Sequence, residues 1–295
     1  MKTQLFILLL LVTACAGNPG KKQGERVITV TIEPQRYFTE AIAGDKFKVI
    51  SMVPKGSSPE TYDPTPQQLV SLGESEAYFR IGHIGFEQTW MDRLLKNAPH
   101  ISVFDTSKGI DLIYGEGHTH GDHYHPGGVE PHIWNSAANA QVITSNIYKA
   151  LCTLDRENES YYLARYDSIN QRILHTDSIL SSILTADADS AFMIYHPALS
   201  YFARDYGLEQ ISIEEEGKEP SPGHLKNLIE HCKAKNVRVV FVQPEFDKRN
   251  AEIIAQQTNT QIVPINPLAY DWEEEMIHTA RSLSPALSKR EGEGR

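Results

Sequence analysis

The chain has little cysteine, with three among 295 residues. No two of them form a Cys-x-x-Cys pair, which excludes a zinc site of paired thiolates, and Cys152 and Cys232 either form one disulfide or remain two buried thiols. The sequence also lacks the His-Glu-x-x-His motif of zinc peptidases, the Gly-x-Ser-x-Gly motif of serine hydrolases and the P-loop of nucleotidases. A formal net charge of −10 argues against a nucleic-acid partner and suits a soluble protein that handles cations.

The sequence also lacks a long apolar run. The apolar run at the N-terminus is too short to span a bilayer. Lys2 precedes the apolar residues 5–12, and the small residues Val12-Thr13-Ala14 lead directly to Cys15. This order is the lipobox pattern of bacterial lipoproteins. We therefore expect residues 1–14 to be a signal peptide and Cys15 to carry the lipid. Residues 15–25 would tether the protein to a membrane at its periplasmic or other extracytoplasmic face.

Short apolar strands alternate with helical segments in two stretches of the chain. Strands are predicted at 26–34, 47–56, 77–82 and 100–107, and again at 191–197, 208–214, 237–245 and 261–267. Continuous apolar strands between helices predict parallel sheets that are covered on both faces. We expect an α/β fold of two small lobes, residues 26–155 and 187–283, each a mostly parallel sheet flanked by helices.

Between the lobes, apolar residues recur at three and four positions through 137–186, which predicts helices. The second helix would reach roughly 40 Å, longer than one small lobe. We therefore expect residues 156–186 to form a rigid helix that joins the lobes. No internal sequence repeat accompanies their shared alternation. Residues 284–295 have no apolar face and are expected to be disordered.

Four metal-capable side chains lie directly beside prolines where predicted strands or loops end: Glu60, His132, His196 and Asn266. In open α/β sheets ligands bind at the carboxyl ends of the strands, and proline stiffens the turn that presents a ligand. Two imidazoles and a carboxylate are ordinary zinc ligands. Asn266 is a poor zinc donor that either orients a neighbour or leaves the fourth place to water. Zinc is the first prediction, with manganese or iron as alternatives because they accept more oxygen ligands.

Residues 117–134 hold five of the twelve histidines. Four of the five, His118, His120, His123 and His125, lie in a glycine-rich loop at 115–129, a composition that gives no fixed geometry. We expect these four to capture metal loosely near the cleft and His132 to be the tight ligand. The acidic run Glu-Glu-Glu-Gly at 214–217 is expected to be solvated surface.

Six segments, taken together and in order, resemble the solute-binding receptors of bacterial zinc and manganese ABC importers. They read GSSPETYDPTPQQL, GFEQTWMDRL, EPHIWNS, YHPALSYFARDYGL, EGKEPSPGHL and INPLAYDW, and the likeness runs from Ile28 to about Met276. The resemblance implies one ion between two lobes, a monomer without catalysis, and delivery to a membrane permease and a cytoplasmic ATPase. It also implies a zinc-type member, since residues 115–129 match the family's His-rich insertion.

Two positions depart from the family pattern. The first ligand, usually histidine after the proline, is Glu60, and the last, usually acidic before Pro-Leu, is Asn266. The set Glu60, His132, His196 and Asn266 keeps the single negative charge of three imidazoles and one carboxylate. The carboxylate has moved from the second lobe to the first.

A rival interpretation is a metallo-β-lactamase-like hydrolase with two zinc ions. The segment HTHGDH fits the His-x-His-x-Asp-His pattern, with His118, His120, Asp122 and His123 as ligands of a water-activating site. That fold requires a layered β-sandwich and further ligands downstream. The alternation of strands and helices argues against it.

Overall fold

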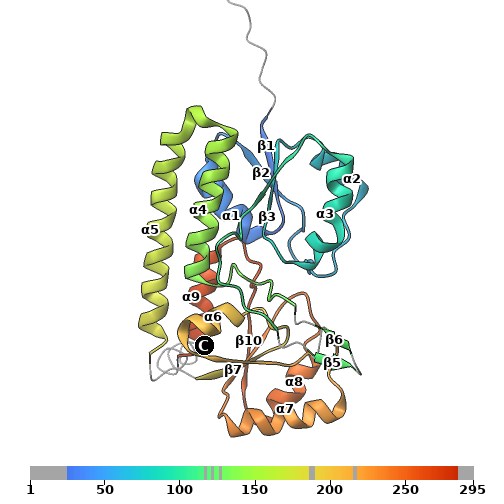
Figure 1. Ribbon diagram of the computed structural model, residues 1–295. Coiled ribbons are helices and arrows are strands. Elements are labelled where there is room, and N and C mark those ends of the chain that lie inside the picture. Colours follow the sequence, from blue (N-terminus) through green and yellow to red (C-terminus); the bar gives the residue numbers. More distant parts are fainter. Residues whose placement is uncertain are drawn as a thin grey trace, which may run out of the picture.

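The computed structural model describes residues 25–115, 118–120, 123–125, 128–185, 190–214 and 218–284. The predicted signal peptide, the lipidated Cys15, all but the last residue of the tether and the tail beyond Ser284 lie outside these residues. Two α/β lobes stack end to end beside a pair of long helices (Figure 1). Within the described residues, no helix is both long and apolar enough to cross a membrane.

The N-terminal lobe is a four-stranded parallel sheet in the order β2-β1-β3-β4. Its strands are β1 (Val27–Val30), β2 (Lys48–Ser51), β3 (Ala77–Arg80) and β4 (Ser102–Asp105), and its helices are α1 (Glu33–Ala43), α2 (Pro66–Leu72) and α3 (Gly85–Asn97). The predicted parallel sheet is confirmed. Each strand is shorter than the segment that was predicted for it. The first predicted segment, for example, continues into Thr31 and Ile32, which are buried but lie beyond the last residue pair of β1 and β2.

The C-terminal lobe repeats this topology. Its strands are β7 (Ala191–Ile194), β8 (Glu209–Ser212), β9 (Val239–Val242) and β10 (Gln261–Pro264), and its helices are α6 (Ser200–Tyr206), α7 (Pro222–Ala234), α8 (Arg249–Thr258) and α9 (Trp272–Ser282). The order β10-β9-β7-β8 is all parallel. When this order is read from the β8 edge and the strands of each lobe are numbered along the chain, both sheets have the order second, first, third and fourth. The lobes therefore share a fold that no sequence repeat reveals.

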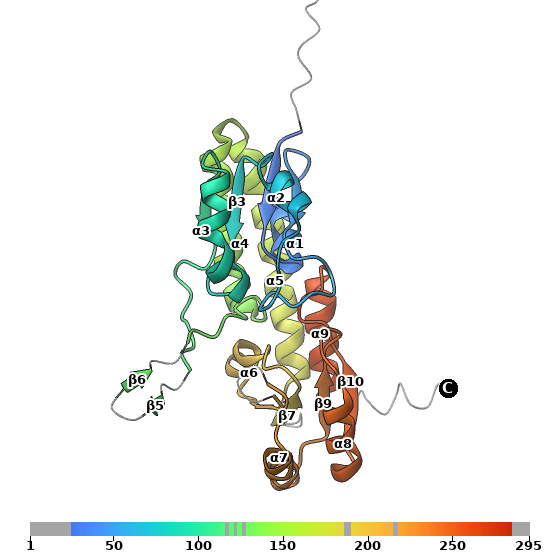
Figure 2. The same ribbon diagram turned by 90° about the vertical axis from the view of Figure 1, so that its right-hand side faces the viewer.

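The predicted joining helix is confirmed as α5 (Glu159–Ile183), which follows α4 (Ala137–Leu154) and a short 3-10 turn, Arg156–Asn158. At 25 residues α5 spans roughly 38 Å. It packs against α4 and α1 on one side of the molecule and against α9 of the C-terminal lobe. Figure 2 shows α5 running past both lobes.

A single apolar core continues through both lobes. Phe192 and Ile194 on β7 belong to the same buried cluster as Ile28 and Phe38 of the N-terminal lobe. The alternate residue Met193 faces a second, smaller cluster under α7 and α8. This alternation covers both faces of the C-terminal sheet and makes the contact between the lobes part of the core.

Two tryptophans link the lobes within that core. Trp272 on α9 is 2% exposed, its ring packs edge-on against Phe38 of α1, and its Nε1 donates to the Trp134 carbonyl at 2.8 Å. Trp134 Nε1 in turn donates to the Pro267 carbonyl at 2.7 Å. Buried indole N–H groups are thereby satisfied while both rings exclude water.

The histidine-rich loop departs from the prediction of irregular structure. β5 (His118–His120) and β6 (His123–His125) pair as a short antiparallel hairpin, with His118 opposite His125 and His120 opposite His123. The hairpin lies to one side of the lobes (Figure 2). Two His-x-His segments pair as strands here, and the glycine content of the loop alone did not indicate this regular structure. Asp122 lies outside the described residues.

The two cysteines of the described chain are free thiols. Cys152 on α4 is half-buried and Cys232 on α7 is buried. Of the two alternatives that the sequence left open, the structure has the unpaired one.

Replacing Trp272 with alanine should lower the free energy of unfolding by about 3–5 kcal/mol, because it opens a cavity between the lobes and breaks the bond to Trp134. Urea unfolding followed by circular dichroism measures this change. Ile253→Ala, at an exposed position on α8, is the matched control and should stay within about 0.5 kcal/mol of the parent. A loss below about 1 kcal/mol for Trp272→Ala would contradict the shared core.

Candidate metal-binding site

A small cavity lies between the lobes, at the carboxyl ends of their strands. Its volume of about 20 Å³ has room for one water-sized particle. The N-terminal lobe contributes Ser58, Pro59 and Glu60 to its lining, and the segment before α4 contributes His132 and Trp134. Seven residues come from the C-terminal lobe: His196, Ala198, Gln243, Glu245, Phe246, Pro267 and Leu268. The cavity has the size of an ion site and is far smaller than a pocket for an organic ligand.

Two histidines face each other across this cavity. The Nε2 atoms of His132 and His196 are 3.1 Å apart. Two nitrogens on one tetrahedral zinc ion, each at about 2.0–2.1 Å, would lie roughly 3.3 Å apart. The observed separation is therefore close to the spacing that a shared metal ion requires.

Each of the two imidazoles is held from behind by a carboxylate. His132 Nδ1 lies 2.5 Å from Glu130 Oε1, and His196 Nδ1 lies 2.8 Å from Glu214 Oε1. Because an ionised carboxylate only accepts hydrogen bonds, both Nδ1 atoms must donate. Both Nε2 atoms then present lone pairs to the cavity, unless a proton is taken up. Carboxylate-held imidazoles are the usual arrangement of histidine ligands to a metal.

Glu130 is fixed by its surroundings. Burial alone would raise the pKa of Glu130, but the hydrogen bonds and charge of His132 together lower it below its usual range. Its second oxygen accepts from Ser200 Oγ at 3.1 Å, and Tyr201 Oη donates to its carbonyl at 2.9 Å. A charged Glu130, held by Ser200 and Tyr201 at the start of α6, therefore orients the His132 ring.

Ring and amide contacts hold His196 in the same way. Phe246 stacks on its imidazole with ring centroids 4.9 Å apart. The Gln243 side chain brackets the His196 backbone, since Oε1 accepts from its N–H at 3.2 Å and Nε2 donates to its carbonyl at 2.6 Å. Both braces come from the turn after β9, so this turn sets the position of the second imidazole.

Glu60 reaches the cavity from the turn after β2. Its Oε2 accepts from the Gly85 N–H at 3.1 Å, at the start of α3. A Cβ at position 85 would lie 2.6 Å from Oε2, so this close approach requires glycine. The other oxygen, Oε1, is buried and finds no hydrogen-bond partner within the described residues. One carboxylate oxygen of Glu60 is thus free to bind a cation.

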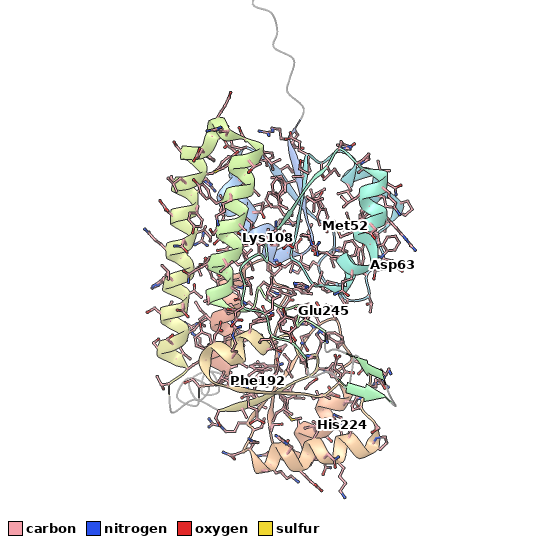
Figure 3. The ribbon with its side chains drawn as sticks, viewed as in Figure 1. Met52, Asp63, Lys108, Phe192, His224 and Glu245 are labelled. Atoms are coloured by element: carbon pink, nitrogen blue, oxygen red, sulfur yellow. The ribbon has the colours of Figure 1, made fainter. Side chains whose placement is uncertain are left out.

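Glu245 also lines the cavity, and the sequence analysis missed it. It follows Pro244 directly after β9 and lies between the lobes in Figure 3. Its Oε1 is buried without a hydrogen-bond partner in the part of the chain that is described. Burial raises the pKa of Glu245, and its own backbone and the charge of His196 offset only part of this effect. A metal-capable group beside a proline at a strand end is the pattern that singled out the other four residues, so the signal was present.

Asn266 is not brought to the cavity. It lines a separate groove with Glu275 and His278. Its Oδ1 accepts from the Leu268 N–H at 3.1 Å, and its own N–H donates to Glu275 Oε1 at 2.7 Å. The side chain thus closes the turn after β10, and the structure places it apart from Glu60, His132 and His196.

Within the described residues, no three His, Cys, Asp or Glu side chains converge closely enough to enclose an ion as they stand. The imidazole pair is already in a chelating arrangement, while Glu60 and Glu245 line the same cavity from different lobes, each with one unpartnered buried oxygen. Unpartnered buried carboxylate oxygens and facing imidazole lone pairs are both relieved by a divalent cation. The donor set fits such an ion after carboxylate rotation.

Solved structures with this fold bind several metals. A crystal structure of ZnuA superposes with a TM-score of 0.80 at 36% identity and covers 87% of this chain and 96% of that one. A ZnuA deletion mutant with zinc bound gives the same TM-score and identity, with coverages of 88% and 98%. The laminin-binding adhesin of Streptococcus agalactiae, at 22% identity and a TM-score of 0.76 over 88% of this chain and 100% of that one, shares the fold.

Curated relatives are named for different ions. FimA of Streptococcus parasanguinis, a metal ABC transporter lipoprotein, is 28% identical and covers 88% of this chain and 85% of its own. The iron lipoprotein MtsA of Streptococcus pyogenes is 29% identical over 87% and 85% of the two chains. The high-affinity zinc uptake protein ZnuA of Bacillus subtilis is 27% identical over 90% and 88%. These names leave the metal of the present chain open.

The family model described as "Zinc-uptake complex component A periplasmic" matches residues 28–286. The predicted resemblance to metal-importer receptors is thereby confirmed, and the family is one of transport components rather than of hydrolases. With the two-lobe fold and the imidazole pair between the lobes, the chain belongs to the zinc-uptake complex component A family.

Proposed function

We propose that this protein binds one divalent cation, zinc before all others, between its lobes and delivers it to an ABC-type permease with a cytoplasmic ATPase. The observation that carries the proposal is the His132–His196 pair, whose Nε2 atoms lie 3.1 Å apart with both Nδ1 atoms held by carboxylates. Imidazole ligands favour zinc over magnesium and calcium. Glu60 supplies a third ligand through its unpartnered oxygen. The ion is cargo, so the protein performs no chemistry on it.

The setting follows from the N-terminal sequence. A lipid on Cys15 would hold the protein at the extracytoplasmic face of a membrane, where the permease accepts the ion. The protein would act there as a monomer. The imidazoles of His118, His120, His123 and His125 would gather ions loosely and raise their concentration near the cavity. Tight binding is assigned to the cavity alone.

A receptor for manganese or iron is the second candidate. Two carboxylates, Glu60 and Glu245, line the cavity beside two imidazoles. Manganese and iron accept carboxylate oxygen ligands readily, and a site with two carboxylates therefore suits them better than a site rich in imidazole. The relative MtsA, which is named for iron, supports this second candidate.

His196→Ala should abolish tight zinc binding, lowering the affinity by more than about 100-fold, because it removes one of two nitrogen ligands. Deleting residues 116–127 should leave one tight site per chain. Isothermal titration against a competing chelator measures both. His231→Ala is the matched control, since His231 pairs with Glu209 on the surface of α7. Loss of tight binding on loop deletion, with His196→Ala unaffected, would refute the assignment.

Glu130→Gln and Glu214→Gln should each weaken zinc binding by about 10–100-fold, since they leave the ring contacts in place but remove the charge that orients each imidazole. The same titration applies. Glu209→Gln, which neutralises the carboxylate of the exposed His231 pair, should bind as the parent does. Parent-like affinity in both cavity variants would mean that the carboxylates do not support ligands.

Metal analysis of the protein isolated from cells, followed by competition between zinc and manganese on the loop-deleted form, tests the cargo. Zinc should be recovered at about one equivalent and should displace manganese, as the general order of metal affinities requires. Stoichiometric manganese or iron in the isolated protein, with zinc excluded, would favour the second candidate.

A further inference from the structure

The geometry points to Glu245, and not Asn266, as the carboxyl-terminal lobe's second ligand to the ion. We infer a site of two imidazoles and two carboxylates. Glu60 comes from the N-terminal lobe, His132 from the segment before α4, and His196 and Glu245 from the C-terminal lobe. This inference rests on the proposed function, because it concerns the ion that the cavity is proposed to bind.

Strand order is the first argument. In the C-terminal sheet β7 and β9 are the central neighbours, and the chain leaves them toward opposite edges of the sheet. The crevice at the carboxyl ends of two such strands is where open parallel sheets bind their ligands. His196 comes two residues after β7, and Glu245 comes three residues after β9. Both side chains therefore start at the same crevice. The turn after β10 reaches the cavity through Pro267 and Leu268 and not through Asn266.

The second argument is hydrogen bonding. Only one oxygen of Glu60 has a protein partner, and the Oε1 of Glu245 has none among the described residues, although both atoms are buried. Leaving a buried carboxylate oxygen unpaired is unfavourable, and a bound cation removes the penalty for both at once. The Asn266 amide oxygen, in contrast, already accepts a hydrogen bond from Leu268.

Charge is the third argument. Two carboxylates and two neutral imidazoles carry a charge of about −2, which a divalent cation cancels. A set with Asn266 in place of Glu245 would have only one carboxylate ligand, in a cavity that Trp134, Phe246 and Leu268 also line.

The two carboxylates would also broaden the range of metals. Half of the four ligand atoms would be oxygen, and oxygen ligands are those that manganese and iron accept. Zinc would still bind through the two imidazoles. Glu245 would thereby set how far the site departs from a zinc-only receptor.

The test compares Glu245→Gln with Asn266→Ala in the loop-deleted protein. Glu245→Gln keeps the side-chain shape and removes the charge, and it should weaken zinc by more than about 100-fold, beyond the range typical of residues that only support ligands. Manganese should weaken further still. Asn266→Ala should leave both affinities within about threefold of the parent. Affinities come from chelator competition, and X-ray absorption of the zinc-loaded proteins gives the coordination number and the number of imidazole ligands.

A second readout separates coordination from fold stability. In the metal-free form, Glu245→Gln should melt no lower than the parent, since it removes an unpaired buried carboxylate. On zinc addition the parent should gain far more thermal stability than the variant. Parent-like zinc affinity in Glu245→Gln would overturn the inference, as would a large loss in Asn266→Ala. If the parent itself bound no ion tightly, the proposed function would fail first, and the two failures are thus distinguishable.

Discussion

Two imidazole rings, inclined at 74° and held by carboxylates with their Nε2 atoms facing each other, are the constraint on which the rest of the site depends. With Glu130 and Glu214 behind them, His132 and His196 turn their lone pairs toward a common point. In the absence of a cation that arrangement is repulsive unless a proton intervenes. The Phe246 stack and the Gln243 brackets prevent the rings from turning away. The imidazole pair is therefore preorganised, and binding of an ion would cost little free energy for reordering these two ligands.

The fold supplies that rigidity through two like lobes and a shared core. Both sheets have the same strand order, and both direct the carboxyl ends of their strands at the gap between the lobes, where ligand-bearing turns meet. The α5 helix and the core that joins Trp272 to Phe38 oppose a wide hinge opening. Release of the ion would then proceed by small movements of the turns that carry Glu60 and Glu245. Such turns are less tightly packed than the strands that they follow.

The sequence predicted most of the fold, since the alternation of apolar strands and helices survives any detail of packing. It did not reveal that the lobes are topological copies, because strand order leaves no trace in residue identity. Glu214 was expected on solvated surface within an acidic run, yet its oxygen holds His196. No local pattern distinguishes such a carboxylate from its neighbours, and only the pairing of β7 with β8 brings it there. Asn266 was singled out beside a proline, but its side chain closes the turn after β10 and lines the second groove, while Pro267 and Leu268 of that turn line the cavity.

Metal preference in this chain is a question of how carboxylates are distributed. Where the family pattern has histidine after a proline, Glu60 stands, and its turn tolerates the exchange because Gly85 admits one carboxylate oxygen and leaves the other free. The loss of a nitrogen ligand weakens the distinction between zinc and its neighbours in the first transition series. The imidazole pair retains part of it, because imidazole nitrogen suits zinc better than it suits manganese. With the proposed ligands, selectivity would be set by a rigid nitrogen pair and adjustable oxygens, and the balance between them would lie in the two turns rather than in the lobes.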